Sequence, residues 1–286
     1  MPIFPLPTPL SDHELLKTTC RLYTKSLLKV IPFSFLCAAI IHFFRYGKAY
    51  LPIQWQPYHQ ETAIVLLVLT LPIMGAMITM IDNIATEAKM SVLGILKISA
   101  VRFLSLIGAL ASIAFVPLIL LGLCVLGYFA LLYYNVNFNV IFAWTMLSPL
   151  IVFASLVSNI YALWLISSDG LDANDAQTRS QLLVKNNYWR TFSHGLFAVL
   201  VIVFFLKIPD MYNYYFASMK LNHLWVELIA EGLLMIIGPW SLVFLLTNKY
   251  DLQIRKKAEI ADPDLQARKQ KVQSAIPANK SGNVTF

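Results

Sequence analysis

The sequence predicts an all-α fold: a polytopic membrane helical bundle of six transmembrane helices, with an N-terminal amphipathic helix and cytoplasmic connecting helices. Two observations lead to this prediction. Of the 286 residues, 58% are hydrophobic and 13% are charged, and the mean hydropathy is +0.66, whereas soluble domains carry about 25% charged residues. No charged residue occurs between Arg102 and Asp169, a stretch long enough for two spans of roughly 20 residues each.

Six apolar runs mark the expected spans. Each run should be helical, because unpaired backbone polar groups are costly in hydrocarbon. The runs cover residues 30–44, 63–81, 103–132, 140–166, 191–206 and 221–247. The chain is therefore expected to divide into a cytoplasmic N-terminal segment (1–29), a six-helix transmembrane domain (30–247) and a charged, partly disordered cytoplasmic tail (248–286).

The distribution of lysine and arginine predicts the orientation of the spans. If the N-terminus lies inside, only four of the 22 basic residues fall in outside segments, namely Arg45, Lys48, Lys207 and Lys220. The positive-inside rule then places both termini in the cytoplasm. We attribute the formal net charge of +7 to this topology and to lipid contact, and we expect no nucleic-acid partner.

The segment before the first span should form a basic amphipathic helix. Lys17, Arg21, Lys25 and Lys29 repeat every four residues, and Ser11 or Asp12 is suited to cap a helix that begins near His13. Another side of this helix is apolar and comprises Leu16, Cys20, Tyr23, Leu27 and Val30. The basic face either contacts anionic headgroups or is simply solvated. We favour headgroup contact, because each charge near an anionic membrane gains about 1 kcal/mol.

Two glutamates stand at the start of the last apolar run. His223, Glu227 and Glu231 are spaced by four residues, so they share one helix face. About 24 Å of apolar helix follows Glu231, which places it near the outer interface. One interpretation is an ion pair with an outer-side cation, and Arg45 is the first choice because its planar guanidinium binds carboxylates with two hydrogen bonds. The other is a polar pocket for a lipid headgroup or a proton.

Motifs for catalysis or cofactor binding are missing from the sequence. Cys20, Cys37 and Cys124 are far apart, and the five histidines are scattered, so no metal-ligand spacing occurs. The phosphate-binding loop, the dinucleotide fingerprint and the nucleophile elbow do not occur either. We therefore expect a protein without a cofactor or metal that is not an enzyme.

One stretch resembles a known family. A span that ends in "LWLISSDG" is followed by "AQTRSQLLVKNNYWRTF" and another span. This arrangement is similar to that of the YciC-like inner-membrane proteins and of the membrane domains attached to some glycerophosphodiester phosphodiesterases. The residues that match are Asp169, Gly170, Ala176, Arg179, Ser180, Leu182, Asn187 and Trp189. The turn between the third and fourth spans departs from the family pattern: the stretch "LLYYNVNFN" stands where these families often have a Pro-Gly turn.

The resemblance implies a six-helix bundle in the bacterial inner (cytoplasmic) membrane with an envelope or lipid-related role. We expect a non-enzymatic integral membrane protein that acts through lipid or protein contacts in envelope maintenance. Its expected partners are membrane phospholipids and also another membrane protein or a second copy of the chain. The alternative is a proton-coupled or lipid transporter with a polar site at Glu227 and Glu231. Coupled transporters usually keep ionisable groups near the midplane, where this sequence has none, which favours the first hypothesis.

Overall fold

The computed structural model describes residues 4, 8–88, 90–134, 136–216 and 223–261. Within several helices it describes the backbone alone at some positions, including Arg45, His223 and Glu227. The described residues contain no strand, so the all-α fold is confirmed. The elements are α1 Asp12–Tyr50, η1 Ile53–Tyr58, α2 His59–Ala85, α3 Val92–Val101, α4 Phe103–Tyr133, α5 Phe138–Val157, α6 Ala162–Trp164, η2 Leu165–Asp169, α7 Ala173–Val184, α8 Tyr188–Phe216 and α9 His223–Ala261.

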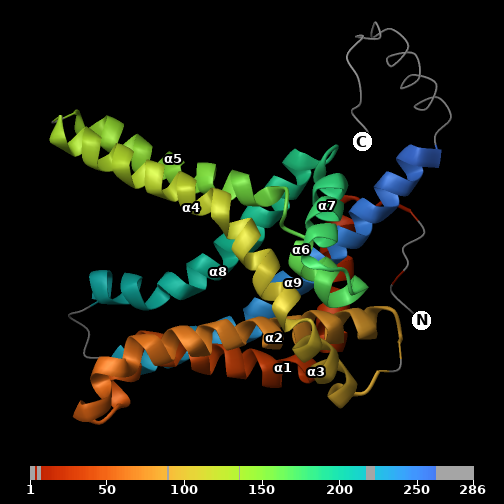
Figure 1. The fold of residues 1–286 in the computed structure, drawn as a ribbon, viewed down its shortest axis with the longest axis horizontal. Coiled ribbons are helices and arrows are strands. Elements are labelled where there is room, and N and C mark those ends of the chain that lie inside the picture. Colours follow the sequence, from red (N-terminus) through yellow and green to blue (C-terminus); the bar gives the residue numbers. More distant parts are fainter. Residues whose placement is uncertain (1–3, 5–7, 89, 135, 217–222, 262–286) are drawn as a thin grey trace, which may run out of the picture.

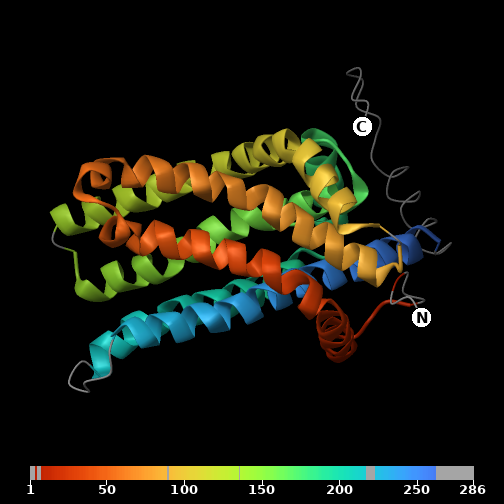
Figure 2. The same ribbon diagram turned by 90° about the horizontal axis from the view of Figure 1, so that it is seen from below.

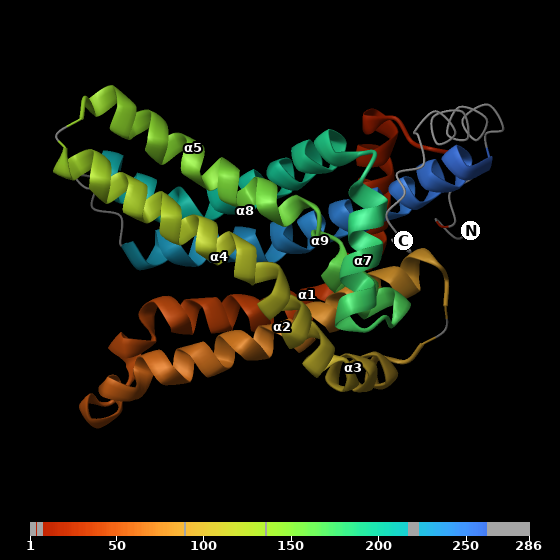
Figure 3. The same ribbon diagram turned by 45° about the horizontal axis from the view of Figure 1, so that its top comes forward.

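Six of the described helical segments are long and apolar enough to cross a membrane, as the sequence predicts. The long helices form the pairs α1–α2, α4–α5 and α8–α9 (Figure 1), and α1 also packs along α9. The α4–α5 pair diverges from the α1–α2 pair (Figure 3). We call the end that carries the start of α1, α3, α7 and the last turns of α9 the base of the bundle, and the end that carries η1 the far end.

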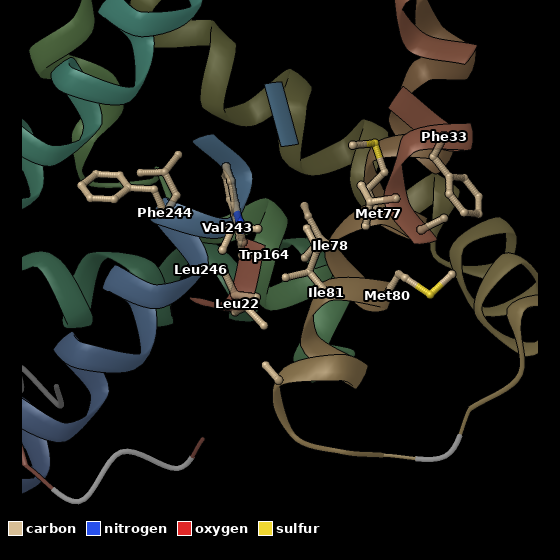
Figure 4. Close-up of a cluster of buried hydrophobic side chains, with 14 of the residues drawn as sticks. Leu22, Phe33, Met77, Ile78, Met80, Ile81, Trp164, Val243, Phe244 and Leu246 are labelled. Atoms are coloured by element: carbon tan, nitrogen blue, oxygen red, sulfur yellow. The ribbon is translucent and has the colours of Figure 1, made fainter. Parts of the chain in front are cut away.

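The buried core lies towards the base. A cluster of apolar side chains from α1, α2, α6 and α9 meets there (Figure 4), comprising Leu22, Phe33, Met77, Ile78, Met80, Ile81, Trp164, Val243, Phe244 and Leu246 among others. Farther from the base, α4 and α5 leave large side chains such as Phe115 and Leu126 about two-thirds exposed, at 64% and 66%. Such an apolar surface is suited to contact with lipid acyl chains rather than with water.

Helix α1 joins the predicted amphipathic helix and the first span without a break. It starts with a capping box in which the Ser11 side chain accepts from the Glu14 amide and the Glu14 carboxylate accepts from the Ser11 amide. Of the two predicted capping residues, Ser11 and Asp12, the structure therefore has Ser11, and Asp12 is the first residue of the helix. Figure 2 shows that the first turns of α1, in red, stand at a steep angle to the rest. Pro32 lies inside the helix, and proline removes a hydrogen bond and bends a helix.

The fourth span differs from its prediction. The apolar span is confirmed over Phe138–Asp169, but its α-helix is interrupted. Helix α5 ends at Val157, and a turn at 158–161 separates it from α6 and the π-helix η2. The side chain of Ser180, on α7, inserts at this turn. Its hydroxyl accepts from the Tyr161 amide at 3.2 Å and donates to the Ser158 carbonyl at 2.9 Å. A side chain inserted into the backbone ladder in this way breaks a helix.

The predicted connecting helices are present at the base. Helix α3 is short and apolar, and Arg102 ends α3 and begins α4. Helix α7 links the π-helix to α8, and Asp172 caps it by accepting from the Asp175 amide at 2.8 Å. The last helix also exceeds its predicted length, because α9 continues past Thr247 to Ala261.

Candidate functional site

Four consecutive polar residues of α9 occupy the centre of the base. Asn248, Lys249 and Asp251 are completely buried, and Tyr250 is partly buried. Each side chain bonds to a different part of the chain. We call this set and its partners the base network. The sequence predicts that these residues begin the charged tail. The network was not predicted, because most of its members bond to partners that are distant along the chain.

Lys249 forms the central ion pair of the base network. Its ammonium lies 2.7 Å from the Asp169 carboxylate and donates to the Ser168 hydroxyl at 2.5 Å. The Lys249 side chain is 0% exposed and that of Asp169 is 23% exposed. An unpaired buried charge is strongly destabilising, so the folded protein needs this contact whenever Lys249 is charged.

The Asp-Gly pair that the resemblance singled out has a structural explanation. Gly170 has φ +73°, in the left-handed region that favours glycine. A Cβ atom there would also lie 2.6 Å from the Arg102 guanidinium, which donates to the Ser167 carbonyl at 2.5 Å. Burial lowers the pKa of Arg102 from its ordinary value, and the nearby Asp169 carboxylate opposes this shift. The tight turn therefore places Asp169 where Lys249 reaches it.

The neighbouring residues of α9 extend the base network to two more helices. Tyr250 donates a short hydrogen bond to Asp82 at the end of α2. Asn248 donates to the hydroxyl of Tyr161, which is fully buried beside the break after α5. These bonds fix the end of α9 against α2 and α6.

Asp251 joins the N-terminal segment to the network. Its carboxylate accepts from the Leu10 amide at 2.6 Å and from the Arg255 side chain at 2.8 Å, and it lies 3.4 Å from Arg190. Arg190, near the start of α8, also pairs with Asp12 at 2.6 Å. The start of α1, the start of α8 and the end of α9 are thus held together by charge.

Glu231 lies in a separate polar contact towards the far end. Both of its carboxylate oxygens lie close to Nδ1 of His42 on α1, at 2.7 and 2.8 Å. The two side chains are 15% and 21% exposed. They open onto a groove of about 330 Å³ with otherwise apolar walls from α1 and α9, comprising Phe35, Ala38, Ala39, Leu228, Gly232 and Met235.

The predicted partner of Glu231 was Arg45, three residues beyond His42 on the same helix. The side chains of Arg45, His223 and Glu227 lie outside the described residues, so a contact between Arg45 and Glu231 stays a prediction. The contact with His42 is one that sequence reasoning missed. His42 stands at the far end of the first span like Arg45, but the sequence alone does not show which side of the helix faces α9.

The basic row of α1 is displayed on the surface as predicted. Lys17, Arg21, Lys25 and Lys29 are all exposed. Of the predicted apolar side, Leu16 and Cys20 are exposed, Tyr23 and Leu27 are partly buried, and Val30 is buried. The row that packs on the protein lies beside it. Those buried residues are Leu15, Thr19, Leu22, Ser26 and Val30. Packing against the bundle buries the polar Thr19 and Ser26 as well, which hydrophobicity alone does not indicate.

Exposed apolar side chains accompany the basic row. Leu16 is 39% exposed and Leu28 is 84% exposed. Cys20 and Thr24 lie between them on the same row, so this exposed row is largely apolar with one hydroxyl. The N-terminal half of α1 therefore carries three rows: one packed on the protein, one exposed and apolar, and one exposed and basic. Helices that lie in the membrane interface combine an apolar face and a basic face in this way.

The remaining residues of the resemblance divide into two groups. Ala176 and Ser180 are buried on α7, where Ser180 occupies the helix break. Arg179 is exposed on the opposite side of α7, and Trp189, at the start of α8, is 77% exposed. The first group supports the fold, and the second group faces the surroundings of the base.

Together these features define the class of the protein. It is an all-α, multi-pass integral membrane protein whose helices are joined at the base by a buried network of charged and polar side chains. Comparisons of the chain with protein-family models, with curated proteins and with solved structures give no match.

Proposed function

We propose that this protein binds anionic phospholipids at the base of its bundle and acts through these contacts in maintenance of the bacterial envelope. The observation that supports this function is the three-row surface of α1. Its basic row and its exposed apolar row lie side by side on a helix that turns away from the bundle axis (Figure 2). The apolar row would enter the edge of the acyl region while the basic row meets phosphate groups.

The length of α1 agrees with this placement. Its 39 residues extend about 58 Å, whereas the hydrocarbon core is about 30 Å thick. The turns before Pro32 are therefore not needed to cross the membrane. In this proposal they lie along the cytoplasmic surface of the inner membrane, and no catalytic step is involved.

The test is retention of lipid by the purified protein. Changing Lys17, Arg21 and Lys25 together to glutamine should remove bound phosphatidylglycerol, as counted by native mass spectrometry. On the scale of about 1 kcal/mol per charge, the apparent affinity should fall on the order of a hundredfold. The wild-type retention should also weaken at high salt, because salt screens exposed charges.

A charge-preserving variant serves as the control. Lys17→Arg, Arg21→Lys and Lys25→Arg made together should retain as much phosphatidylglycerol as the wild type. If the glutamine variant also retains the wild-type amount, the basic row is only solvated and the proposal fails.

The transporter alternative has one supporting observation, the contact between His42 and Glu231 on an apolar groove. This contact lies towards the far end of the bundle, away from the middle of the span, and its position therefore favours the lipid-contact function.

A further inference from the structure

A second groove at the base lies between α7 and the last described turns of α9. It has a volume of about 580 Å³ and is separate from the basic row of α1. From α7 come Thr178 and Arg179, and from α9 come Gln253, Lys256 and Lys257. Leucines of α7 and of the turn before it supply an apolar wall. The lining of the groove thus combines polar and charged side chains with apolar ones.

The charges that line this groove are unbalanced. Arg179, Lys256 and Lys257 supply three positive charges, and Asp175 supplies one negative charge, so the described lining carries a net charge of +2. Lys256 is held in place, because its ammonium donates to the Leu182 carbonyl across the groove at 2.6 Å. Arg179 and Lys257 are exposed and lie on different helices that face each other.

We propose that this groove binds a phosphate monoester. Such a group carries a charge of about −1.5 to −2 at neutral pH, which matches the lining. Arginine binds phosphate through two parallel hydrogen bonds, whereas lysine acts as a point charge. The hydroxyl of Thr178 and the amide of Gln253 are further donors. This inference goes beyond the proposed function, because it assigns a second site with a different ligand chemistry.

The size of the groove indicates how large the bound phosphate monoester can be. Grooves of about 300–1,000 Å³ suit small organic molecules, so this one has room for more than a phosphate ion. The apolar wall, which includes Leu182 and Leu183, would contact the carbon part of the ester. Two sources supply this chemistry: the headgroup of phosphatidic acid in the membrane, and a soluble ester such as glycerol 3-phosphate.

The experiment uses the full chain in phosphatidylcholine nanodiscs. Binding of glycerol 3-phosphate is measured by calorimetry, and phosphatidic acid is measured by its retention in native mass spectra. Arg179→Gln and Lys257→Gln should each weaken binding about tenfold or more. Asp175→Asn should strengthen it a fewfold, because it removes the one carboxylate of the described lining. Lys185→Gln is the matched control: Lys185 is exposed at the end of α7 outside the groove, and its loss should change nothing.

The two ligands separate the sources. Binding of glycerol 3-phosphate points to a soluble ester, and retention of phosphatidic acid alone points to a lipid headgroup; either result supports the proposal if it depends on Arg179 and Lys257. It is overturned if neither ligand binds, or if Arg179→Gln behaves like Lys185→Gln. It is also overturned if only the α1 glutamine variant loses phosphatidic acid, a result that would leave the proposed function standing.

Discussion

At the scale of single residues, Lys249 shows how a charge becomes part of a membrane protein's interior. Its side chain is completely buried, yet it has the Asp169 carboxylate and the Ser168 hydroxyl within hydrogen-bonding distance. Taking a charge out of water costs several kcal/mol, which its partners must offset. Losing one partner should therefore harm the fold more than losing both.

We predict that Asp169→Asn destabilises the protein by about 3–5 kcal/mol, because it leaves the completely buried Lys249 ammonium without its carboxylate. Lys249→Met should cost less, because Asp169 is 23% exposed and lies near Arg102. The double variant should cost clearly less than the sum of the two single changes. Unfolding by sodium dodecyl sulfate in mixed micelles, followed by circular dichroism, measures these differences. Lys185→Met, at an exposed site, should stay within about 0.5 kcal/mol of the wild type. Additive effects of the two single variants would show that the pair is not coupled.

At the scale of elements, side chains of neighbouring helices donate hydrogen bonds to backbone groups where a helix's own hydrogen-bond ladder is interrupted. Pro239 lies inside α9 and lacks the N–H that would bond to the carbonyl of Met235. Ser34 of α1 donates to that carbonyl at 2.6 Å, and Tyr23 donates to the next carbonyl, of Ile236, at 2.7 Å. The interruption of the hydrogen-bond ladder at Pro239 and the packing of α9 on α1 are therefore linked.

At the turn after α5, a side chain of another helix likewise bonds to backbone groups that lack a partner in their own helix, and this gives a second prediction. Ser180→Ala removes both hydrogen bonds that bridge residues 158–161 and leaves buried backbone groups unpaired, so it should cost about 1–3 kcal/mol. Hydrogen exchange at the Tyr161 amide should become faster. Ser193→Ala is the control, because Ser193 is exposed and bonds within its own helix; it should change neither quantity. Unchanged exchange at Tyr161 in Ser180→Ala would mean that the break does not depend on Ser180.

At the scale of the whole molecule, the base and the far end differ in charge. The described basic residues of the base include those of α1, α7 and the end of α9, whereas Arg45, Lys48 and Lys207 lie towards the far end. The start of α1 and the end of α9 also meet at the base, since the Leu10 amide donates to Asp251. If each of the six apolar helices crosses the membrane, both described ends lie on the same side, and the positive-inside rule predicts that this side is the cytoplasm.

This orientation predicts the pattern of cysteine labelling. In a background in which the three native cysteines are alanine, Gln54→Cys on η1 should react with an impermeant maleimide in spheroplasts. Asn174→Cys on α7 should react only after the membrane is permeabilised. Both positions are exposed, so accessibility differs only by the side of the membrane. Labelling of Asn174→Cys in intact spheroplasts would reverse the orientation.

The sequence by itself determined the features that depend on local pattern. Hydropathy located all six spans, because a helix in lipid needs a continuous apolar run of sufficient length. The start of α1, with Ser11 or Asp12 as its cap, and the exposed basic row of α1 followed from the types and spacing of neighbouring residues. Such features require only that the chain be helical, and their periodicity is visible without any partner.

Only the tertiary structure decided which residues meet. Lys249 and Asp169 are 80 residues apart, and His42 and Glu231 are 189 apart, so no local pattern indicated either pairing. The break at 158–161 stayed hidden for the same reason, since the stretch is apolar throughout and Ser180 reaches it from another helix. Helix faces, too, were settled by packing, which buried Thr19 and left Leu16 exposed. A polar group near a span is satisfied by whichever helix approaches it, and that approach depends on the arrangement of the whole bundle.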